Sequence, residues 1–346
     1  MTGSRQARLR VGVAGLGSMG QNHVRLLAAR SDVRLAAVAD PDEHLLGTVG
    51  RKAGAQRFAS PLAMIDEAGL DALVVAAPTT AHLELALAAI EHGIPVLVEK
   101  PLAATPAEAR RIADAAAHRG VAVQVGHVER FNPAVRKLSL LLHEGWLTSV
   151  YSISSRRAGP FPSRIRDVGV TIDLATHDVD ILSWIAGERP TRVFAETAQR
   201  VHTAHEDLLF GLLYFASGAT GFLDVNWLTP IKRRELMVVG EEGMFELDYL
   251  TQRLTFTKQP DVAHPRLLGG FAPTFDVDVV ELRVDRGEPL AAELDAFLSV
   301  VRGESQPVVT AEDGVWAVTI AQALLSSSTA HAPVALDAGS REAVPA

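Results

Sequence analysis

The first 122 residues alternate short apolar runs with amphipathic helical runs, and this alternation limits the fold more than any other feature of the chain. Helical runs are expected around residues 19–30, 42–53, 81–92 and 105–119. The apolar runs between them are continuous, as strands are when helices cover both faces of a parallel sheet. The pattern predicts an α/β fold with a doubly wound parallel sheet. Its expected strands are LRVGVAG, VRLAAVAD, DALVVAAP, IPVLVEKP and VAVQVGH.

The alternation of apolar runs with helical runs ends after Tyr151. One helix, expected over 168–186, precedes five strand-like runs separated by short turns, which predicts an antiparallel meander. Two further helices are expected near 289–302 and 311–330. The five runs are TRVFAETAQRV, DLLFGLLYFA, ATGFLDVNWL, RRELMVVG and MFELDYL.

A length of 346 residues is too great for one ordinary core and suggests two domains. We expect an N-terminal doubly wound Rossmann domain at 1–126. A C-terminal α+β domain with an open, mainly antiparallel sheet is expected at 127–334, followed by a tail at 335–346.

Composition limits the possible partners. The chain has 33 basic and 41 acidic residues, and its net charge of -8 disfavours nucleic acid or an anionic membrane as the main partner. It has no cysteine, so disulfides, thiolate metal sites and cysteine nucleophiles are excluded. No run of about 18 apolar residues suggests a membrane span. We therefore expect a cytoplasmic protein that binds a small molecule.

The run Leu208–Phe215 is apolar on both faces of its expected strand. One face should cover the helices of its own domain, which leaves the other in need of a cover. This predicts a homo-oligomer, a dimer or a tetramer, assembled through the open sheet face. The alternative is that a distant loop covers the strand.

The segment GLGSMG places Gly15, Gly17 and Gly20 in G-x-G-x-x-G spacing between an expected strand and a helix that starts near Met19. The first glycine permits a tight turn, the second lets the backbone approach a pyrophosphate, and the third allows close helix packing. The helix N-terminus attracts the negative charge. We expect this loop, with Ser18 and Met19, to bind a dinucleotide.

Asp40 lies twenty positions after Gly20, at the end of the second expected strand. A carboxylate there accepts hydrogen bonds from an adenosine ribose and repels a 2′-phosphate, which favours NAD over NADP. The alternative is that Asp40 only caps the next helix or turn.

Two further segments, AAPTTAH and VEKP, follow strands at the carboxyl ends where a doubly wound sheet binds ligands. They place Pro78, Thr79, His82, Glu99 and Lys100 as candidates to line the cofactor cleft. Thr79 is equally suited to cap the helix that follows it. For His82, a structural role is at least as well supported as cofactor binding.

The segment TIDLATHDVDILSWIAG contains a polar stripe on an otherwise apolar helix. At 100° per residue, Asp173, His177, Asp180 and Trp184 fall on one side of about three turns. Apolar rows flank this stripe, so the helix is expected to be buried. A buried helix does not ordinarily carry two acids and an imidazole in a row, so this stripe needs an explanation.

The dinucleotide fold, E-K-P after one of its strands, and D-x-x-x-H on a helix that opens a sheet-rich domain together resemble the Gfo/Idh/MocA oxidoreductase family. The resemblance implies that Lys100, Asp173 and His177 surround the carbinol carbon of a sugar or cyclitol. Pro101 fixes the backbone after Lys100 and is a candidate for a cis peptide bond.

The chemistry of alcohol oxidation suits these residue types. A base must take the hydroxyl proton as hydride leaves for the nicotinamide, and an imidazole titrates near neutral pH. We expect His177 to be that base, Lys100 to hydrogen-bond the same oxygen, and Asp173 to orient substrate hydroxyls or join the proton relay. Lys100 as proton acceptor is the alternative. Nothing in the sequence requires a metal, and Asp180 is suited to bracing an arginine or the helix.

Several segments resemble the branch of UDP-N-acetylglucosamine 3-dehydrogenases, which implies oxidation at C3 of this nucleotide sugar or a close relative. The alternatives are an inositol, scyllo-inosose or free-sugar dehydrogenase, and a non-catalytic regulator that binds dinucleotide and sugar. The segments are VGHVERFNPAV, SSRRAGPFPSRIRDVGVTIDLATHD, VNWLTPIKRREL and GMFELDYLTQ.

A cationic cluster before the polar helix supports a diphosphate-bearing substrate. Arg156, Arg157, Arg164 and Arg166 fall within eleven positions, and arginine forks suit a diphosphate. Phe161, in a stiff GPFP segment, is suited to stack on a base or sugar. The alternative is a solvated or oligomer-contact loop.

Two smaller features complete the candidate substrate residues. Lys232, Arg233 and Arg234 form a second cationic group. Asn132 is suited to hold a sugar hydroxyl or the nicotinamide amide, or to cap a helix that begins at Pro133.

Overall fold

The computed structural model describes residues 8–162, 168–202, 204–259, 266–268, 272–274 and 278–337. Over residues 8–128, all of them described, six parallel strands form a sheet in the order β3-β2-β1-β4-β5-β6. This is the doubly wound order, with its switch point between β1 and β4. The strands are β1 (Leu9–Ala14), β2 (Val33–Ala39), β3 (Gln56–Phe58), β4 (Ala72–Val75), β5 (Val96–Glu99) and β6 (Val123–Gly126).

The predicted parallel sheet is confirmed, and its central strands are buried as continuous apolar runs. The edge strand β3 was not predicted, because its sequence QRF contains no apolar run. Helices alternate with the strands: α1 (Ser18–Ala28), α2 (Glu43–Leu45), the π-helical turn η1 (Leu46–Gly50), α3 (Arg51–Ala53), α4 (Pro61–Glu67), α5 (Thr79–Glu91) and α6 (Pro106–Arg119).

The chain divides into two compact units, one of Met1–Val128 with Leu290–Thr319 and one of Glu129–Pro289 with Ile320–Ala346. The first unit therefore includes 290–319, which the sequence analysis assigned to the second domain. The reason lies in α9 (Pro289–Val301), whose Leu294, Phe297 and Leu298 pack into the same core as β1 and β2. The sequence does not show which distant segments pack together, so this contact could not be predicted.

The second unit contains a sheet of nine strands among the described residues, in the order β16-β13-β12-β11-β7-β10-β9-β8-β17. The strands are β7 (Val150–Pro160), β8 (Arg192–Ala198), β9 (Leu208–Tyr214), β10 (Thr220–Asn226), β11 (Leu228–Gly240), β12 (Gly243–Asp248), β13 (Arg253–Lys258), β16 (Val279–Leu282) and β17 (Val334–Ala335). The short strands β14 (Arg266–Leu268) and β15 (Ala272–Thr274) pair with each other.

The predicted open, mainly antiparallel sheet is confirmed, but a simple meander is wrong. β7 lies between β10 and β11, parallel to β10 and antiparallel to β11. This strand was missed because its sequence, with two serines and two arginines in the middle, lacks an apolar run. Its position matters because the strand carries the predicted arginine cluster.

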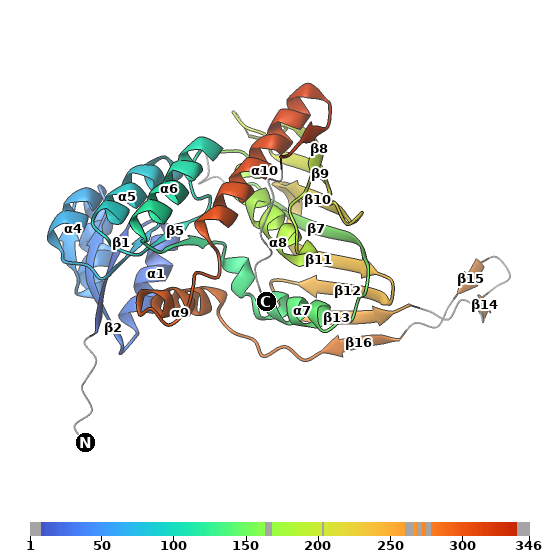
Figure 1. The fold of residues 1–346 in the computed structure, drawn as a ribbon, viewed down its shortest axis with the longest axis horizontal. Coiled ribbons are helices and arrows are strands. Elements are labelled where there is room, and N and C mark those ends of the chain that lie inside the picture. The colour runs from blue at the N-terminus through green and yellow to red at the C-terminus, as the bar shows by residue number, and fades with distance from the viewer. Residues whose placement is uncertain are drawn as a thin grey trace, which may run out of the picture. The chain divides into compact units, whose positions relative to one another are not determined.

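Helices cover one face of this sheet. The unit contains the 3₁₀ turn η2 (Val128–Phe131), α7 (Pro133–His143), the π-helical turn η3 (Thr171–Ala175) and α8 (Thr176–Ala186), and α10 (Ala311–Ala330) contributes to both units. α8 packs against β7, and α7 packs against β12 and β13 (Figure 1). None of the helices in the described ranges combines the length and apolar character needed to cross a membrane.

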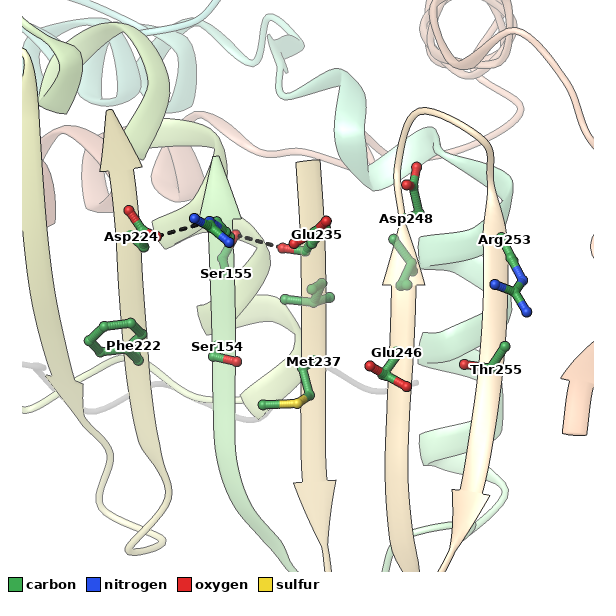
Figure 2. A pocket seen from close by; sticks show the side chains of 13 residues that line it. Ser154, Ser155, Phe222, Asp224, Glu235, Met237, Glu246, Asp248, Arg253 and Thr255 are labelled. Atoms are coloured by element: carbon green, nitrogen blue, oxygen red, sulfur yellow. Dashed lines mark hydrogen bonds and ion pairs between the residues drawn. The ribbon is translucent and has the colours of Figure 1, made fainter. Parts of the chain in front are cut away.

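The other face of the sheet is open. Along β9, buried residues alternate with accessible ones, and Phe210 is 45% exposed. A shallow depression of about 470 Å³ lies on this face and is lined by residues of β7 and β10–β13 (Figure 2). The apolar character that the sequence predicts for both sides of β9 is thus present, and the described residues leave Phe210 on one side accessible.

Candidate active site

The glycine-rich loop between β1 and α1 has the form that a dinucleotide requires. Gly15 has φ +92°, and a Cβ there would lie 2.5 Å from the carbonyl oxygen of Ala76. A Cβ on Gly20 would lie 1.9 Å from the carbonyl oxygen of Gly15, so both positions need glycine. Gly17 precedes α1 as its N-cap, has no atom within 4 Å of an added Cβ, and leaves the exposed Ser18 and half-buried Met19 at the helix start. The uncapped helix N-terminus and open approach fit a pyrophosphate.

Asp40 is buried behind this loop. Its Oδ2 accepts a hydrogen bond from the backbone N–H of Leu16 at 2.6 Å, and its Oδ1 accepts from the N–H of Asp42 at 2.8 Å. A carboxylate has about four acceptor positions, so two remain for a ligand. Asp40 therefore fixes the loop and the next turn, and it retains the capacity to hold a ribose.

His82 joins the loops that follow β4 and β5. Its Nδ1 lies 2.9 Å from the carbonyl oxygen of Pro101, and its Nε2 lies 2.9 Å from that of Ala77. Burial lowers the pKa of this histidine, although the two carbonyls oppose the shift. Both ring nitrogens are engaged by the protein, so the structure assigns His82 the structural role rather than direct contact with a cofactor.

Pro78 and Thr79 begin α5 at the same edge of the sheet. Pro78 is exposed and is the N-cap of the helix, while Thr79 is half-buried at its first position. No side chain caps this helix, so capping by Thr79 is not observed. Both residues remain candidates for the cofactor half of the site.

Lys100 follows β5 and is half-buried, and its peptide bond to Pro101 is cis, as predicted. The preceding Glu99 points instead into the core, where it lies 2.7 Å from Nε2 of His23. Glu293 from α9 completes a buried trio whose ligand atoms lie within 4.8 Å of one another. Burial, together with the charge of Glu99, raises the pKa of Glu293 well above its usual value.

The polar helix separates into buried and accessible residues. Asp173, in η3, and His177, one turn later in α8, are partly accessible, whereas Asp178 and Asp180 are buried. Asp180 pairs with Arg130 at 2.5 and 2.8 Å, as the sequence analysis allowed. The widened π-turn is a feature often found at functional sites. Asp173 and His177 are thus the partly accessible acid and imidazole of a helix whose other two acids are buried.

The arginine cluster does not form the expected clamp at its first two positions. Arg156, 49% exposed, lies 3.0 Å from Asp224, and both line the depression on the open face of the sheet. Arg157, 5% exposed, lies 2.9 Å from Asp178 and 3.1 Å from Glu129 on the helix-covered face. Neighbouring residues of a strand point to opposite faces, which separates the two side chains. Arg164 and Arg166 lie outside the described residues.

Phe161 and Asn132 are both held by protein neighbours. Phe161 packs edge-on against His202 and Trp227, with ring centroids 5.5 and 5.8 Å apart. Asn132 is 2% exposed and caps α7, accepting from the N–H of Ala134 at 3.1 Å. Its amide donates to the carbonyl oxygen of Tyr249 at 3.1 Å. The capping alternative is therefore present, and burial leaves Asn132 little access to a substrate.

The partners of these polar residues were largely missed from the sequence. His23 lies on the buried side of the amphipathic α1, and Glu293 lies on the apolar α9, where an acid among apolar residues is the signal that was available. Glu129 and Asp178 pair with Arg157. The sequence around Arg157 is polar and charged, so it gave no sign that this side chain is buried. These contacts join residues far apart in the chain.

Comparisons with known proteins agree with the fold and the motifs. A model of the Gfo/Idh/MocA oxidoreductase family, described as an NAD-binding Rossmann fold, matches residues 9–127, and a model of its C-terminal domain matches 135–246. Inositol 2-dehydrogenase 1 of Saccharopolyspora erythraea is 30% identical, covering 97% of this chain and 98% of the relative. UDP-N-acetylglucosamine 3-dehydrogenase of Acidithiobacillus ferrooxidans is 26% identical, covering 85% and 88%.

A solved structure shares the fold over nearly the whole length. The WlbA dehydrogenase from Bordetella pertussis, in complex with NADH and UDP-GlcNAcA, has a TM-score of 0.79 at 22% identity, with 95% of this chain and 99% of that chain covered. At this identity, the match establishes the architecture.

Proposed function

Because this chain belongs to the Gfo/Idh/MocA oxidoreductase family, we propose that it oxidises a secondary alcohol on a sugar nucleotide with NAD, at C3 of UDP-N-acetylglucosamine or a close relative. One observation carries the proposal. Asp173 and His177 are presented together on the accessible side of a helix whose other acids are buried. A helix that needed these groups only for packing would not leave them accessible.

The loop at Gly17 and the N-terminus of α1 would hold the pyrophosphate, and Asp40 would hold the adenosine ribose. A carboxylate at this position repels a 2′-phosphate, which supports NAD over NADP. When bound, NAD supplies the hydride acceptor. Ser18, Met19, Pro78 and Thr79 complete the proposed cofactor contacts.

The chain itself must handle the proton. His177 accepts the hydroxyl proton, Lys100 donates a hydrogen bond to the same oxygen, and Asp173 orients neighbouring hydroxyls. Lys100 as the acceptor is the alternative assignment. In either case Lys100 stabilises negative charge as it develops on the substrate oxygen, so the reaction needs no metal in that role.

Two substrates have separate support. The nucleotide sugar is supported by the relative that oxidises UDP-N-acetylglucosamine and by the structure that holds UDP-GlcNAcA. A free cyclitol is supported by the inositol dehydrogenases among the relatives and by the ion pairs that occupy Arg156 and Arg157. The second candidate would need no diphosphate contact.

We also infer a homo-oligomer, a dimer or a tetramer, that uses the open sheet face. Phe210 and Phe222 are 45% and 41% exposed on adjacent strands of that face, beside ion pairs such as Arg156–Asp224. A mixed apolar and charged patch suits self-association. Light scattering of wild type and Phe222→Glu tests this: the variant should have a lower mass, and an unchanged mass would reject this face.

The first experiment measures NADH formation by purified protein with NAD, comparing UDP-N-acetylglucosamine with myo-inositol, and uses His177→Ala as the control. Oxidation of the nucleotide sugar that the variant lacks supports the proposal. Oxidation of inositol alone selects the second candidate. No NADH with either substrate would shift the proposal towards a non-catalytic regulator or a retained cofactor.

A further inference from the structure

Lys232 and Arg234 lie together on the helix-covered face of the second unit's sheet. Arg234 pairs in register with Arg157, whose side chain reaches Asp178 of α8 on that face. A Cβ built on Gly159 would lie 3.9 Å from Cγ of Lys232 and 4.0 Å from Nη1 of Arg234. The two cations therefore flank the same glycine, on the side of the sheet that carries the catalytic helix.

The guanidinium of Arg234 is anchored by neutral groups. Its Nη1 donates to the carbonyl oxygens of Ala158 and Arg233 at 2.7 and 2.6 Å. These bonds use only Nη1, so the N–H groups of Nε and Nη2 remain available as donors to a ligand. Across the described ranges, neither Arg234 nor Lys232 forms an ion pair with a carboxylate.

The neighbouring cation has the opposite arrangement. Arg157 is buried between Asp178 and Glu129, so its charge is balanced by the protein itself. Arg233, the residue between the two cations, lies 3.0 Å from Glu235, whose register partner Arg156 faces the open side. Lys232 and Arg234 are thus the members of this basic group whose charges the described part of the protein does not pair directly.

Their electrostatic environment also suits an anion. Burial, with added repulsion from Arg157, lowers the pKa of Arg234 to about 10. Burial and the charges of Arg234 and Arg157 lower the pKa of Lys232. The charges of Asp178, Glu129 and Asp173 act in the opposite direction on the pKa of Arg234, which places its guanidinium within electrostatic range of the proposed catalytic turn. A bound oxyanion would balance both cations.

The geometry points to Lys232 and Arg234 as a subsite for an oxyanion of the substrate, a role that the sequence analysis assigned first to Arg156 and Arg157. The inference rests on the proposed function, in which the oxyanion is the diphosphate of a nucleotide sugar. A sugar carboxylate has the same charge and acceptor chemistry and is the other source. Gly159 keeps the approach free of a side chain.

The test measures binding of UDP and of glucuronate by calorimetry, in wild type, Lys232→Met and Arg234→Gln. Glutamine keeps an N–H for the carbonyl of Ala158 but removes the charge. Arg233→Met is the matched control, because it removes a cation from the same strand on the side of Glu235. We expect each test variant to weaken UDP binding by about tenfold or more, and the control by less than about twofold.

Steady-state kinetics with UDP-N-acetylglucosamine then separate this inference from the proposed function. The test variants should raise KM with little change in kcat, while any KM for myo-inositol stays constant. If wild type oxidises the nucleotide sugar and both variants keep its KM, the subsite is wrong and the proposed function stands. If wild type oxidises only inositol but UDP binding still depends on Lys232, the subsite stands and the proposed substrate is wrong.

The remaining outcomes are also decisive. Loss of glucuronate binding alone would support the subsite and identify the oxyanion as a carboxylate. Equal affinity of wild type and both folded variants for both probes would overturn it, as would a wild type that binds neither. Thermal unfolding checks that each variant is folded before it is scored.

Discussion

The two halves of the candidate site are specified by different parts of the polypeptide. In the first unit, the cofactor half depends on backbone geometry, since Gly15 and Gly20 have no room for a Cβ and Gly17 leaves its approach open. In the second unit, the substrate half depends on which side chains pair, since Arg157 has two carboxylates and Arg234 has carbonyls. The function of a glycine pattern can therefore be inferred from the sequence directly. The function of a charged residue can be inferred only when its partner in the fold is known.

The largest expected effect comes from the accessible imidazole of the substrate half. Replacing His177 with Ala should lower kcat by about 10³–10⁴-fold, because a general base contributes on this scale. Stability should change little, since the side chain is partly accessible. Stopped-flow or steady-state NADH formation, together with thermal unfolding, measures the two quantities.

The neighbouring acid Asp180 provides the contrast for that result. Asp180→Asn leaves Arg130 buried without its carboxylate, so it should lower stability more than His177→Ala does. If His177→Ala unfolds the protein while Asp180→Asn does not, the assignment of functional and structural residues along this helix is reversed.

Sequence alone was sufficient for features that depend on chain-local chemistry. The parallel sheet and the glycine loop follow from runs and spacing, whereas the sequence made the cis bond before Pro101 only a candidate. β7 escaped prediction because its middle carries serines and arginines that find partners only in the folded sheet. Because β7 was not predicted as a strand, the sequence analysis did not predict that Arg156 and Arg157 point to opposite faces of the sheet.

The second prediction tests whether Arg157 is a structural residue. Arg157→Met should lower the free energy of unfolding by about 3–5 kcal/mol, because it leaves the buried Asp178 and the partly buried Glu129 without their cation. Arg156→Ala should change it by less than about 1 kcal/mol, since its ion pair is half exposed. Urea unfolding compares them. If both variants change the free energy of unfolding by equal, small amounts, Arg157 is again a candidate to contact a ligand.

The third prediction concerns the backbone-specified half. Gly20→Ala should cost about 2 kcal/mol in stability, because the new Cβ meets the carbonyl oxygen of Gly15. Gly17→Ala should leave stability nearly unchanged and weaken NAD binding by about tenfold, because the methyl group projects where the pyrophosphate approaches. Unfolding and NAD titration separate these effects. Unchanged NAD affinity in Gly17→Ala would place the pyrophosphate elsewhere.

The last prediction concerns a buried acid in the first unit, Glu293, and appears as a change of stability with pH. Burial and the charge of Glu99 raise the pKa of Glu293 when the protein is folded, so its carboxyl holds a proton that the unfolded chain releases above the usual glutamate value. Unfolding then releases a proton. Rising pH therefore favours the unfolded chain by about 1.4 kcal/mol per pH unit between the two pKa values.

Glu293→Gln replaces the acid with a neutral group of the same shape and should remove this contribution. The stability difference between variant and wild type should grow in favour of the variant as pH rises above the usual glutamate pKa, with a slope of at most about 1.4 kcal/mol per unit. Glu304→Gln, at an exposed position beyond the end of α9, is the control and should follow wild type. Parallel stability curves for Glu293→Gln and wild type would mean that Glu293 is ionised in the fold. His23 would then have to balance two buried carboxylates, Glu99 and Glu293, and the trio would be specified by charge pairing in the same way as the substrate half.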